Sequence, residues 1–576
     1  MPSSDGLSGL RGRRRLTGGT FAGLAALAWI GVSFLALRAV ARLHYDPVTF
    51  DSALYFEMAA LFQRGRWSEA LAYDYPPLYA LLIAVLEPVL GTADAAGLFI
   101  AFGADLLILI PIVAVARRAA GDEAAWAAAF LWAVHLSAVQ LGVQALSDAP
   151  TALCVATALS AGLRAVERRS LPWACGAGVA SGLGFLFRPE GLEPAVALAV
   201  FYALQRHQAG REPSGARKAS LGTRPPARRA GHPAPDPSRR SDAPTPPFRA
   251  PNLVRRGGWI LAPLAGWVLV AGPYVAYISA EAGALTLSKK KSAMGFVRST
   301  VPLPAVGQAA PGAGPRAERL PAPSPGAGSA RGLVRGVYVF QKPVVNGLTP
   351  VIIIPACLGL VSLLSRRKDR WNPALGLLAG LFALHFGILV GLAANKGATY
   401  VGRHHAFLLV LYALPIAGSG LAWALGWLRD RLRGPRWTPA ASLGILVAAT
   451  GLAIMTRGPD LGRSLRPAAV WIRTQVPGTP VIVTGLAKLT YHAGAQRIDL
   501  RGAYADILRR AREHSADFVA LYPEMTAQTA PGFLAGLSPA DLELAKVFPE
   551  PTPQAPEQRL ELYRVLARTA DASGRP

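Results

Sequence analysis

Long apolar runs separated by short polar stretches dominate the chain. The runs lie near 21–37, 97–116, 124–141, 150–166, 172–187, 192–205, 258–280, 349–364, 374–394, 405–428 and 439–456. About 20 apolar residues are enough to cross a bilayer as an α-helix. The pattern therefore predicts a polytopic α-helical membrane protein with about eleven spans.

The positions of the basic residues predict how these spans are oriented. Residues 1–20 are basic, and further arginine clusters follow every second run. Because cytoplasmic loops of membrane proteins are enriched in lysine and arginine, we place residues 1–20 and these clusters on the cytoplasmic side. Ala39-Val40-Ala41 resembles a signal-peptide cleavage site, but the long first run and the many later ones favour an uncleaved first helix. Residues 21–456 then form the transmembrane domain.

One apolar run breaks the alternation if it is counted as a span. Residues 78–90 are apolar but short, and Pro88 lies near their end. If they crossed the membrane, the later basic clusters would lie outside. We therefore expect this run to lie in the membrane interface, within an outer loop that covers residues 43–95.

An odd number of spans places residues 457–576 outside the cytoplasm. Residues 481–485, 517–522, 542–548 and 559–565 read as strands, and 466–476 and 502–514 read as amphipathic helices. The C-terminal part is therefore predicted to be a small extracytoplasmic α/β domain.

Two other stretches have the composition of disordered segments. Residues 206–256 are rich in arginine and proline, and residues 301–332 are rich in proline, alanine and glycine. Such stretches bury too little apolar surface to fold. We interpret 206–256 as a cytoplasmic insert and 281–340 as a flexible outer loop.

The amino-acid composition agrees with a membrane protein and bears on which partners are expected. Hydrophobic residues make up 52% of the chain and charged residues 16%, against about 25% charged residues in soluble domains. The formal net charge is +26, which by itself could indicate nucleic-acid binding. Because the arginines lie in loops between apolar runs, we expect membrane lipids and no nucleic acid as partners.

Unusual polar residues gather at the outer ends of the predicted spans. They are Asp51, Tyr75, Asp148, Arg188, Glu190, Lys289, Lys290 and Arg403. Ionisable groups close to the hydrocarbon are costly and are candidates for function. Arginine and lysine suit a phosphate group, and a carboxylate suits proton transfer from a hydroxyl. The set indicates group transfer from a lipid phosphate on the outer side of the membrane.

Three segments resemble bacterial membrane glycosyltransferases of the GT-C class. They are DSALYFEMAALFQRGRW with the following YDYPPLYALLIAVL, QALSDAPTALCVATALSAGL, and ASGLGFLFRPEGLEP. The similarity is to the protein-mannosyltransferase-like group, family 39, and its aminoarabinose-transferase relatives. The segment from Arg403 to Pro415 and the segment AAVWIRTQVPGTPVIV also resemble these proteins, so the resemblance covers most of residues 20–525.

The resemblance implies a role for each matching residue. Asp51 matches the catalytic aspartate of the first outer loop, which acts as a base, and Arg188 matches an Arg-Pro pair at a helix end. Arg403, Lys289 and Lys290 match loosely the basic residues that hold the donor phosphate. Asp148, Glu190 and Tyr75 are further substrate-binding candidates.

The chain also departs from the family pattern. Ser52 stands where many relatives have a glutamate. The nearest acid, Glu57, lies on another helix face, because six residues turn about 600°. His404 stands where a tyrosine is expected. The sequence therefore does not support a two-carboxylate mechanism.

Each candidate also has a purely structural interpretation. Asp51 could cap a helix over 52–61, and Asp148 could cap the fourth span. Arg188 could extend toward lipid head groups or pair with Glu190. The lysines could be simply solvated.

The resemblance implies an enzyme of the bacterial inner membrane. It would move a sugar from a polyprenyl-phosphate donor to a glycan, lipid or protein acceptor outside the cytoplasm, with inversion of the anomeric centre. No D-x-D triplet is present, so no metal or cofactor is expected. The alternative is a transporter or flippase of lipid-linked sugars or other anions. Because the ionisable residues sit at span ends and no repeat is evident, the transferase is favoured.

Overall fold

The structure is a computed structural model. It describes residues 8–210, 258–289, 348–363, 372–396, 406–432, 438–456, 465–500, 503–523, 526, 531–548 and 559–566. The predicted disordered insert lies outside these ranges from residue 211 to 256. Most of the predicted outer loop 281–340 also lies outside them.

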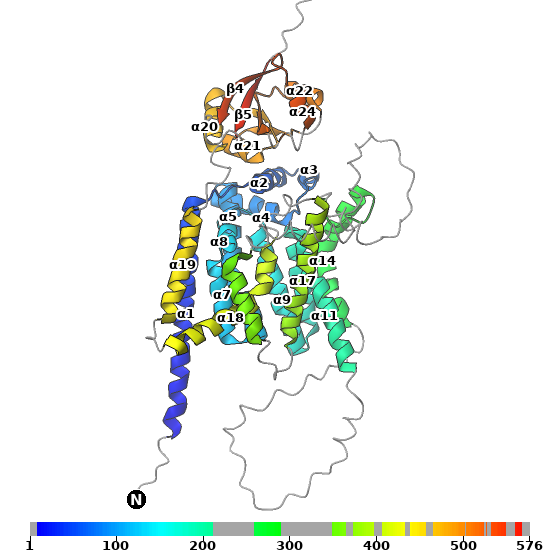
Figure 1. The fold of residues 1–576 in the computed structure, drawn as a ribbon. Helices are drawn as coiled ribbons and strands as arrows, with labels where there is room; N and C mark the ends of the chain where they lie inside the picture. Colours follow the sequence, from blue (N-terminus) through cyan, green and yellow to red (C-terminus); the bar gives the residue numbers. More distant parts are fainter. Residues whose placement is uncertain are drawn as a thin grey trace, which may run out of the picture. The chain divides into compact units, whose positions relative to one another are not determined.

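All of the predicted spans fall in helices within the described part of the chain (Figure 1). The helices are α1 (Ser8–His44), α5 (Ala93–Leu107), α6 (Leu109–Ala120), α7 (Asp122–Val134), α8 (Leu136–Gly142), α9 (Asp148–Arg168), α10 (Leu171–Phe187), α11 (Glu193–Gly210), α14 (Gly258–Ala282), Leu348–Leu363, α17 (Pro373–Lys396), α18 (Phe407–Leu432) and α19 (Thr438–Thr456). Six helical segments in the described ranges are long and apolar enough to cross a membrane, or seven if a bent pair counts as one span. The chain is a multi-pass membrane protein.

The bent pair corrects the expectation of one continuous helix over 124–141. Helices α7 and α8 meet at an angle of 64°. His135 between them has an extended backbone, and its Nδ1 atom accepts a hydrogen bond from the backbone N–H of Ala138 at 3.4 Å. The histidine therefore ends one helix and caps the next, which an apolar run cannot reveal.

The first loop after α1 is helical too. It contains α2 (Phe50–Gln63), α3 (Trp67–Leu71) and α4 (Leu78–Leu90). Helix α4 is the short apolar run of the sequence analysis, with Pro88 inside it. Its position in the membrane interface stays a prediction.

The chain divides into two compact units. The first consists of residues 1–107, 130–150 and 425–576, and the second of residues 108–129 and 151–424. Each is described by itself below.

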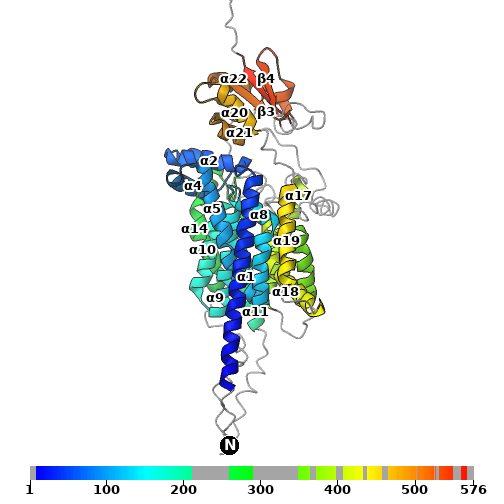
Figure 2. The same cartoon turned by 90° about the vertical axis from the view of Figure 1, so that its left-hand side faces the viewer.

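In the first unit, α1 and α19 lie side by side and run in the same direction (Figure 2). Gly444 lies against Trp29, and Gly451, two turns further along α19, lies against Leu37 on α1. The helices are therefore parallel. Helix α1 contains the first predicted span and α19 contains the last. Because these two helices run in the same direction, an odd number of spans fits the structure.

A buried ion pair joins three helices of the first unit. The Nε atom of Arg38 on α1 lies 2.8 Å from Oδ2 of Asp105 on α5, and both side chains are at most 2% exposed. Trp132 on α7 donates from Nε1 to the other carboxylate oxygen at 2.9 Å, and Arg38 also donates to the Ala133 carbonyl. The pairing compensates two charges that would otherwise be costly in a membrane helix.

The C-terminal domain is a five-stranded mixed sheet between helices. Its elements are α20 (Leu465–Gln475), β1 (Val481–Val483), α21 (Ala487–Ala493), β2 (Gln496–Ile498), α22 (Tyr504–Glu513), β3 (Phe518–Leu521), α24 (Pro531–Ala535), β4 (Leu542–Phe548) and β5 (Leu560–Val565). The strand order is β2-β1-β3-β5-β4. Strand β1 pairs in parallel with β2 and β3, and β5 pairs antiparallel with β3 and β4.

Side-chain alternation along the strands builds two apolar cores. Ile482 and Phe518 pack with α20 and α21, whereas Val483 and Val519 pack with α22. Successive residues of a strand point to opposite faces, so each short strand serves both cores. The four strands read from the sequence are present. Strand β2 was missed because it has three residues and begins with Gln496-Arg497.

In the second unit, α10 and α14 pack backbone against backbone. A Cβ atom on Gly178 would lie 2.1 Å from the Pro263 carbonyl oxygen, and one on Gly266 would lie 2.3 Å from the Cys175 carbonyl oxygen. Small residues permit this close approach, which drives association between helices in membranes.

Candidate active site

Asp51 lies in the first turn of α2. Thr49 caps this helix: its Oγ1 accepts from the Ser52 N–H at 3.1 Å, and the Ser52 hydroxyl accepts from the Thr49 N–H at 3.0 Å. The alternative that Asp51 caps a helix over 52–61 is therefore wrong. The helix dipole favours a negative charge in this first turn, and the carboxylate is left to make other contacts.

Tyr75 is the partner of Asp51. Its hydroxyl donates to Oδ1 of Asp51 at 2.8 Å. The Asp51 residue is half-buried. One carboxylate oxygen is thus held by a neutral donor, an arrangement that orients the carboxylate.

A chain of tyrosine contacts leads from this pair to the start of α9. The ring of Tyr55 meets the rings of Tyr75 and Tyr79 edge-on, at centroid distances of 5.0 and 4.9 Å. The Tyr55 and Ser147 hydroxyls are 2.8 Å apart. Asp148 follows Ser147 and is 1% exposed. Within the first unit, the structure therefore links the Asp51–Tyr75 pair to the Ser147-Asp148 segment.

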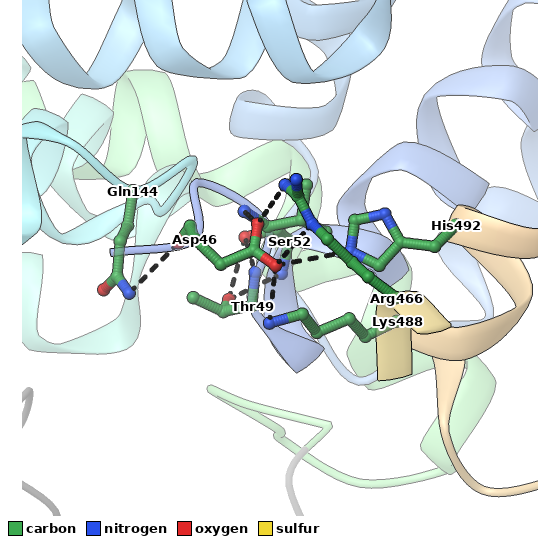
Figure 3. A network of polar contacts seen from close by, with 8 residues as sticks. Asp46, Thr49, Ser52, Gln144, Arg466, Lys488 and His492 are labelled. Carbon is green, nitrogen blue, oxygen red and sulfur yellow. Dashed lines mark hydrogen bonds and ion pairs between the residues drawn. The ribbon is translucent and has the colours of Figure 1, made fainter. Parts of the chain in front are cut away.

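The C-terminal domain contacts the segment just before α2 through Asp46 (Figure 3). Lys488, which is 2% exposed, places Nζ 3.2 Å from Oδ2 of Asp46. Arg466 donates to the two carboxylate oxygens at 3.0 and 3.3 Å, and His492 lies at 3.5 Å. Burial alone would raise the pKa of Asp46, but the neighbouring His492 and the charge of Lys488 together hold it well below its ordinary value.

This lowered pKa predicts how the contact depends on pH. A carboxyl group whose pKa is lower in the folded state contributes its full stability above its unfolded pKa, about 3.9, and loses it as the pH falls further. We expect Asp46→Asn to remove the contribution at neutral pH, about 2 kcal/mol for hydrogen bonds to a charged group.

Hydrogen–deuterium exchange of the amides of α20 and α21 measures this effect. Exchange in Asp46→Asn should be roughly 30-fold faster at pH 7, and the difference from the unchanged protein should shrink progressively as the pH falls below the unfolded pKa toward the lower folded pKa. Equal exchange in the two proteins at pH 7 would show that the Asp46 cluster does not hold the domain.

In the second unit, Arg188 lies at a tight turn between α10 and the 3-10 helix η2 (Pro189–Leu192). It is 9% exposed, and its Nε atom lies 3.6 Å from Oε2 of Glu190, so the expected pairing of these residues occurs. The Ser181 hydroxyl donates to the Gly191 carbonyl at 2.5 Å, and a Cβ on Gly191 would lie 2.1 Å from the carbonyl carbon of Gly184. These contacts fix the turn that carries Arg188.

Next to this turn is a buried cluster that the sequence analysis missed. His385 Nδ1 lies 2.6 Å from one oxygen of Glu193, and the Tyr412 hydroxyl donates to the other at 3.1 Å. All three side chains are at most 7% exposed. A lone histidine inside the apolar run 374–394 was the available signal, because ionisable residues inside membrane helices need a partner.

The remaining basic candidates are placed only in part. Lys289 Nζ lies 2.5 Å from Oε2 of Glu281, and the lysine side chain is 11% exposed. Lys290 and Arg403 lie outside the described residues. Among the residues that are described, no group of three or more His, Cys, Asp or Glu could hold a metal ion.

Comparisons with known proteins bear on the fold and the family. Residues 74–221 match the family Dolichyl-phosphate-mannose-protein mannosyltransferase. This match includes Tyr75, Asp148, Arg188 and Glu190, and begins after Asp51. A comparison with curated proteins gave no match.

Solved structures similar to the chain include ArnT and an oligosaccharyltransferase. ArnT from Cupriavidus metallidurans in the apo state has a TM-score of 0.53 and 12% identity, and covers 94% of this chain and 98% of that one. The same protein bound to undecaprenyl phosphate has a TM-score of 0.50, 13% identity and the same coverage. The Archaeoglobus fulgidus oligosaccharyltransferase has a TM-score of 0.48 and 13% identity, covering 92% of this chain and 74% of that one. The ArnT structures show that the two folds are alike.

Proposed function

We propose that this chain, a GT-C class membrane glycosyltransferase similar to the protein mannosyltransferases and ArnT, transfers a sugar from a polyprenyl-phosphate donor to an acceptor on the extracytoplasmic side of a bacterial inner membrane. The observation that carries the proposal is the Asp51–Tyr75 pair at the start of α2. A half-buried carboxylate that is oriented by one hydrogen-bond donor, in the first loop after α1, can serve as a general base.

In this mechanism Asp51 takes the proton of an acceptor hydroxyl. The hydroxyl oxygen bonds to the anomeric carbon of the donor sugar as the bond from that carbon to the phosphate oxygen breaks. Polyprenyl phosphate leaves with the bonding electrons, and attack from the opposite face inverts the anomeric centre. The departing phosphate is negatively charged, so we assign it to basic side chains. The candidates are Arg188, Lys289, Lys290 and Arg403.

Similarity and chemistry support the nature of the donor. The structure of ArnT from Cupriavidus metallidurans contains undecaprenyl phosphate, a lipid of the proposed class. Since the chain has no D-x-D triplet, we propose transfer without a metal ion. The acceptor is a hydroxyl of a glycan, lipid or protein.

A direct assay tests the function. The purified full-length protein in lipid nanodiscs is incubated with labelled polyprenyl-phosphate sugars and extracted envelope material. We expect label in the acceptor, release of polyprenyl phosphate, inverted stereochemistry, and no change when EDTA is added. An intact donor that moves between the leaflets of proteoliposomes would instead indicate a flippase.

A further inference from the structure

The face of α2 that carries Glu57 contacts the C-terminal domain. Arg497 on β2 donates from Nε and Nη2 to the two carboxylate oxygens of Glu57, at 2.8 and 2.7 Å. The Tyr73 hydroxyl donates to the same carboxylate at 2.9 Å. Two parallel hydrogen bonds between a guanidinium and a carboxylate fix the relative orientation of both groups.

Burial makes this ion pair more than a surface contact. The side chains of Arg497 and Glu57 are 16% and 27% exposed. Burial, together with the charge of Glu57, raises the pKa of Tyr73 to about 12, so the phenol remains a donor. Glu57 therefore accepts three hydrogen bonds, two from Arg497 and one from Tyr73, and these contacts hold its carboxylate in place.

A second contact lies one residue away on the same helix. The ring of Phe56 meets the ring of Tyr491 on α21, with centroids 4.8 Å apart. The Tyr491 hydroxyl in turn donates to Asp94 in the first turn of α5, at 3.1 Å. The C-terminal domain thus holds α2 at Phe56 and Glu57, and it is tied to α5 as well.

The other side of α2 bears the proposed base. Asp51 and Tyr55 are four residues apart and share a helix face, and that face contacts Tyr75, Tyr79 and Ser147. Residue 57 is six positions from residue 51, or about 600° of turn. A contact that fixes Glu57 therefore also fixes the rotation of α2 about its axis. The rotation of α2 in turn sets the direction of the Asp51 carboxylate.

We propose that the C-terminal domain is a positioning element of the active site, in which Arg497 acts through Glu57 to hold α2 at the rotation that aims Asp51 at the acceptor hydroxyl. The inference rests on the proposed role of Asp51 as the base. Misplacing a reacting group by about 1 Å can cost on the order of 100-fold in rate, so a loosened α2 should slow the chemical step and leave donor binding intact.

Kinetics of Arg497→Gln and Glu57→Gln test this role. We expect kcat for sugar transfer to fall by roughly 10- to 100-fold in both variants, with the KM for the lipid donor unchanged. Arg497→Lys should recover only part of the rate, because an ammonium cannot make the bidentate contact. Arg509→Gln is the matched control, since Arg509 is an exposed arginine of the same domain that pairs only within α22 among the described residues.

A charge exchange separates positioning from folding. The double variant Glu57→Arg with Arg497→Glu should restore most of kcat, because the pair is remade with the charges reversed. If Arg497→Gln keeps the rate of the unchanged protein, the proposal is wrong. It is also wrong if the double variant regains the thermal stability of the unchanged protein and is still as slow as the single ones.

Hydrogen–deuterium exchange distinguishes this inference from the proposed function. The amides of α2 should exchange faster in Arg497→Gln than in Arg509→Gln, whether or not a transfer reaction is found. Faster exchange without any transferase activity in the unchanged protein would contradict the proposed function. It would still support the claim that Arg497 holds α2 through Glu57. Unchanged exchange together with unchanged kcat would contradict the positioning role alone.

Discussion

Replacing Asp51 with asparagine is expected to lower kcat for sugar transfer by about 10²- to 10⁴-fold, the usual contribution of a general base. Asparagine has nearly the same shape and can still accept the hydrogen bond that Tyr75 donates at 2.8 Å. It cannot take the acceptor proton. The KM for the lipid donor should not change, because the donor phosphate is assigned to basic side chains.

Tyr75→Phe provides the matched comparison. It removes one hydrogen bond to a charged group and leaves the carboxylate, so the loss of rate should be about tenfold. Initial rates with saturating acceptor measure the loss of kcat in each of the two variants. Donor binding, measured separately, shows that the loss is not one of affinity for the donor. Full transfer by Asp51→Asn in membranes supplied with labelled donor would remove the base assignment.

Breaking the Arg38–Asp105 pair is expected to give the largest loss of stability. Asp105→Leu leaves a guanidinium that is 2% exposed without its carboxylate, and Trp132 without its acceptor. Removing one partner of a buried ion pair typically costs about 3–5 kcal/mol, whereas replacing both by apolar residues costs far less. The yield of folded protein in detergent and its thermal midpoint should therefore fall sharply in the single variant.

The double variant Arg38→Leu with Asp105→Leu should recover most of this loss. Arg429→Gln is the control, because Arg429 pairs with Asp430 on an exposed helix end, where both side chains are more than 60% exposed. A double variant less stable than either single one would show that the charges themselves stabilise the packing of α1, α5 and α7.

The membrane helices could be predicted because their cause is local. In a bilayer the backbone must satisfy its own hydrogen bonds, so an apolar run of sufficient length becomes a helix whatever its neighbours are. The bend at His135 could not be predicted, because it depends on one side chain that caps the following helix.

The same distinction applies in the C-terminal domain. Short runs rich in apolar, β-branched and aromatic residues predicted β1, β3, β4 and β5. Strand β2 is as short as β1, but two of its three residues are the polar Gln496 and Arg497, so it shows no apolar run; it pairs with β1 in the folded domain.

Sequence by itself determined that this protein crosses the membrane many times, that residues 457–576 form an α/β domain, and that Asp51, Tyr75 and Arg188 lie in or beside the segments that connect its apolar helices. Only the tertiary structure decided which side chains meet: Asp51 with Tyr75, Arg38 with Asp105, and Glu57 with Arg497, a pair 440 positions apart. The physical reason is that helix and strand formation follow from neighbouring residues. An ion pair, in contrast, requires two distant segments to be brought within about 3 Å by the packing of everything between them.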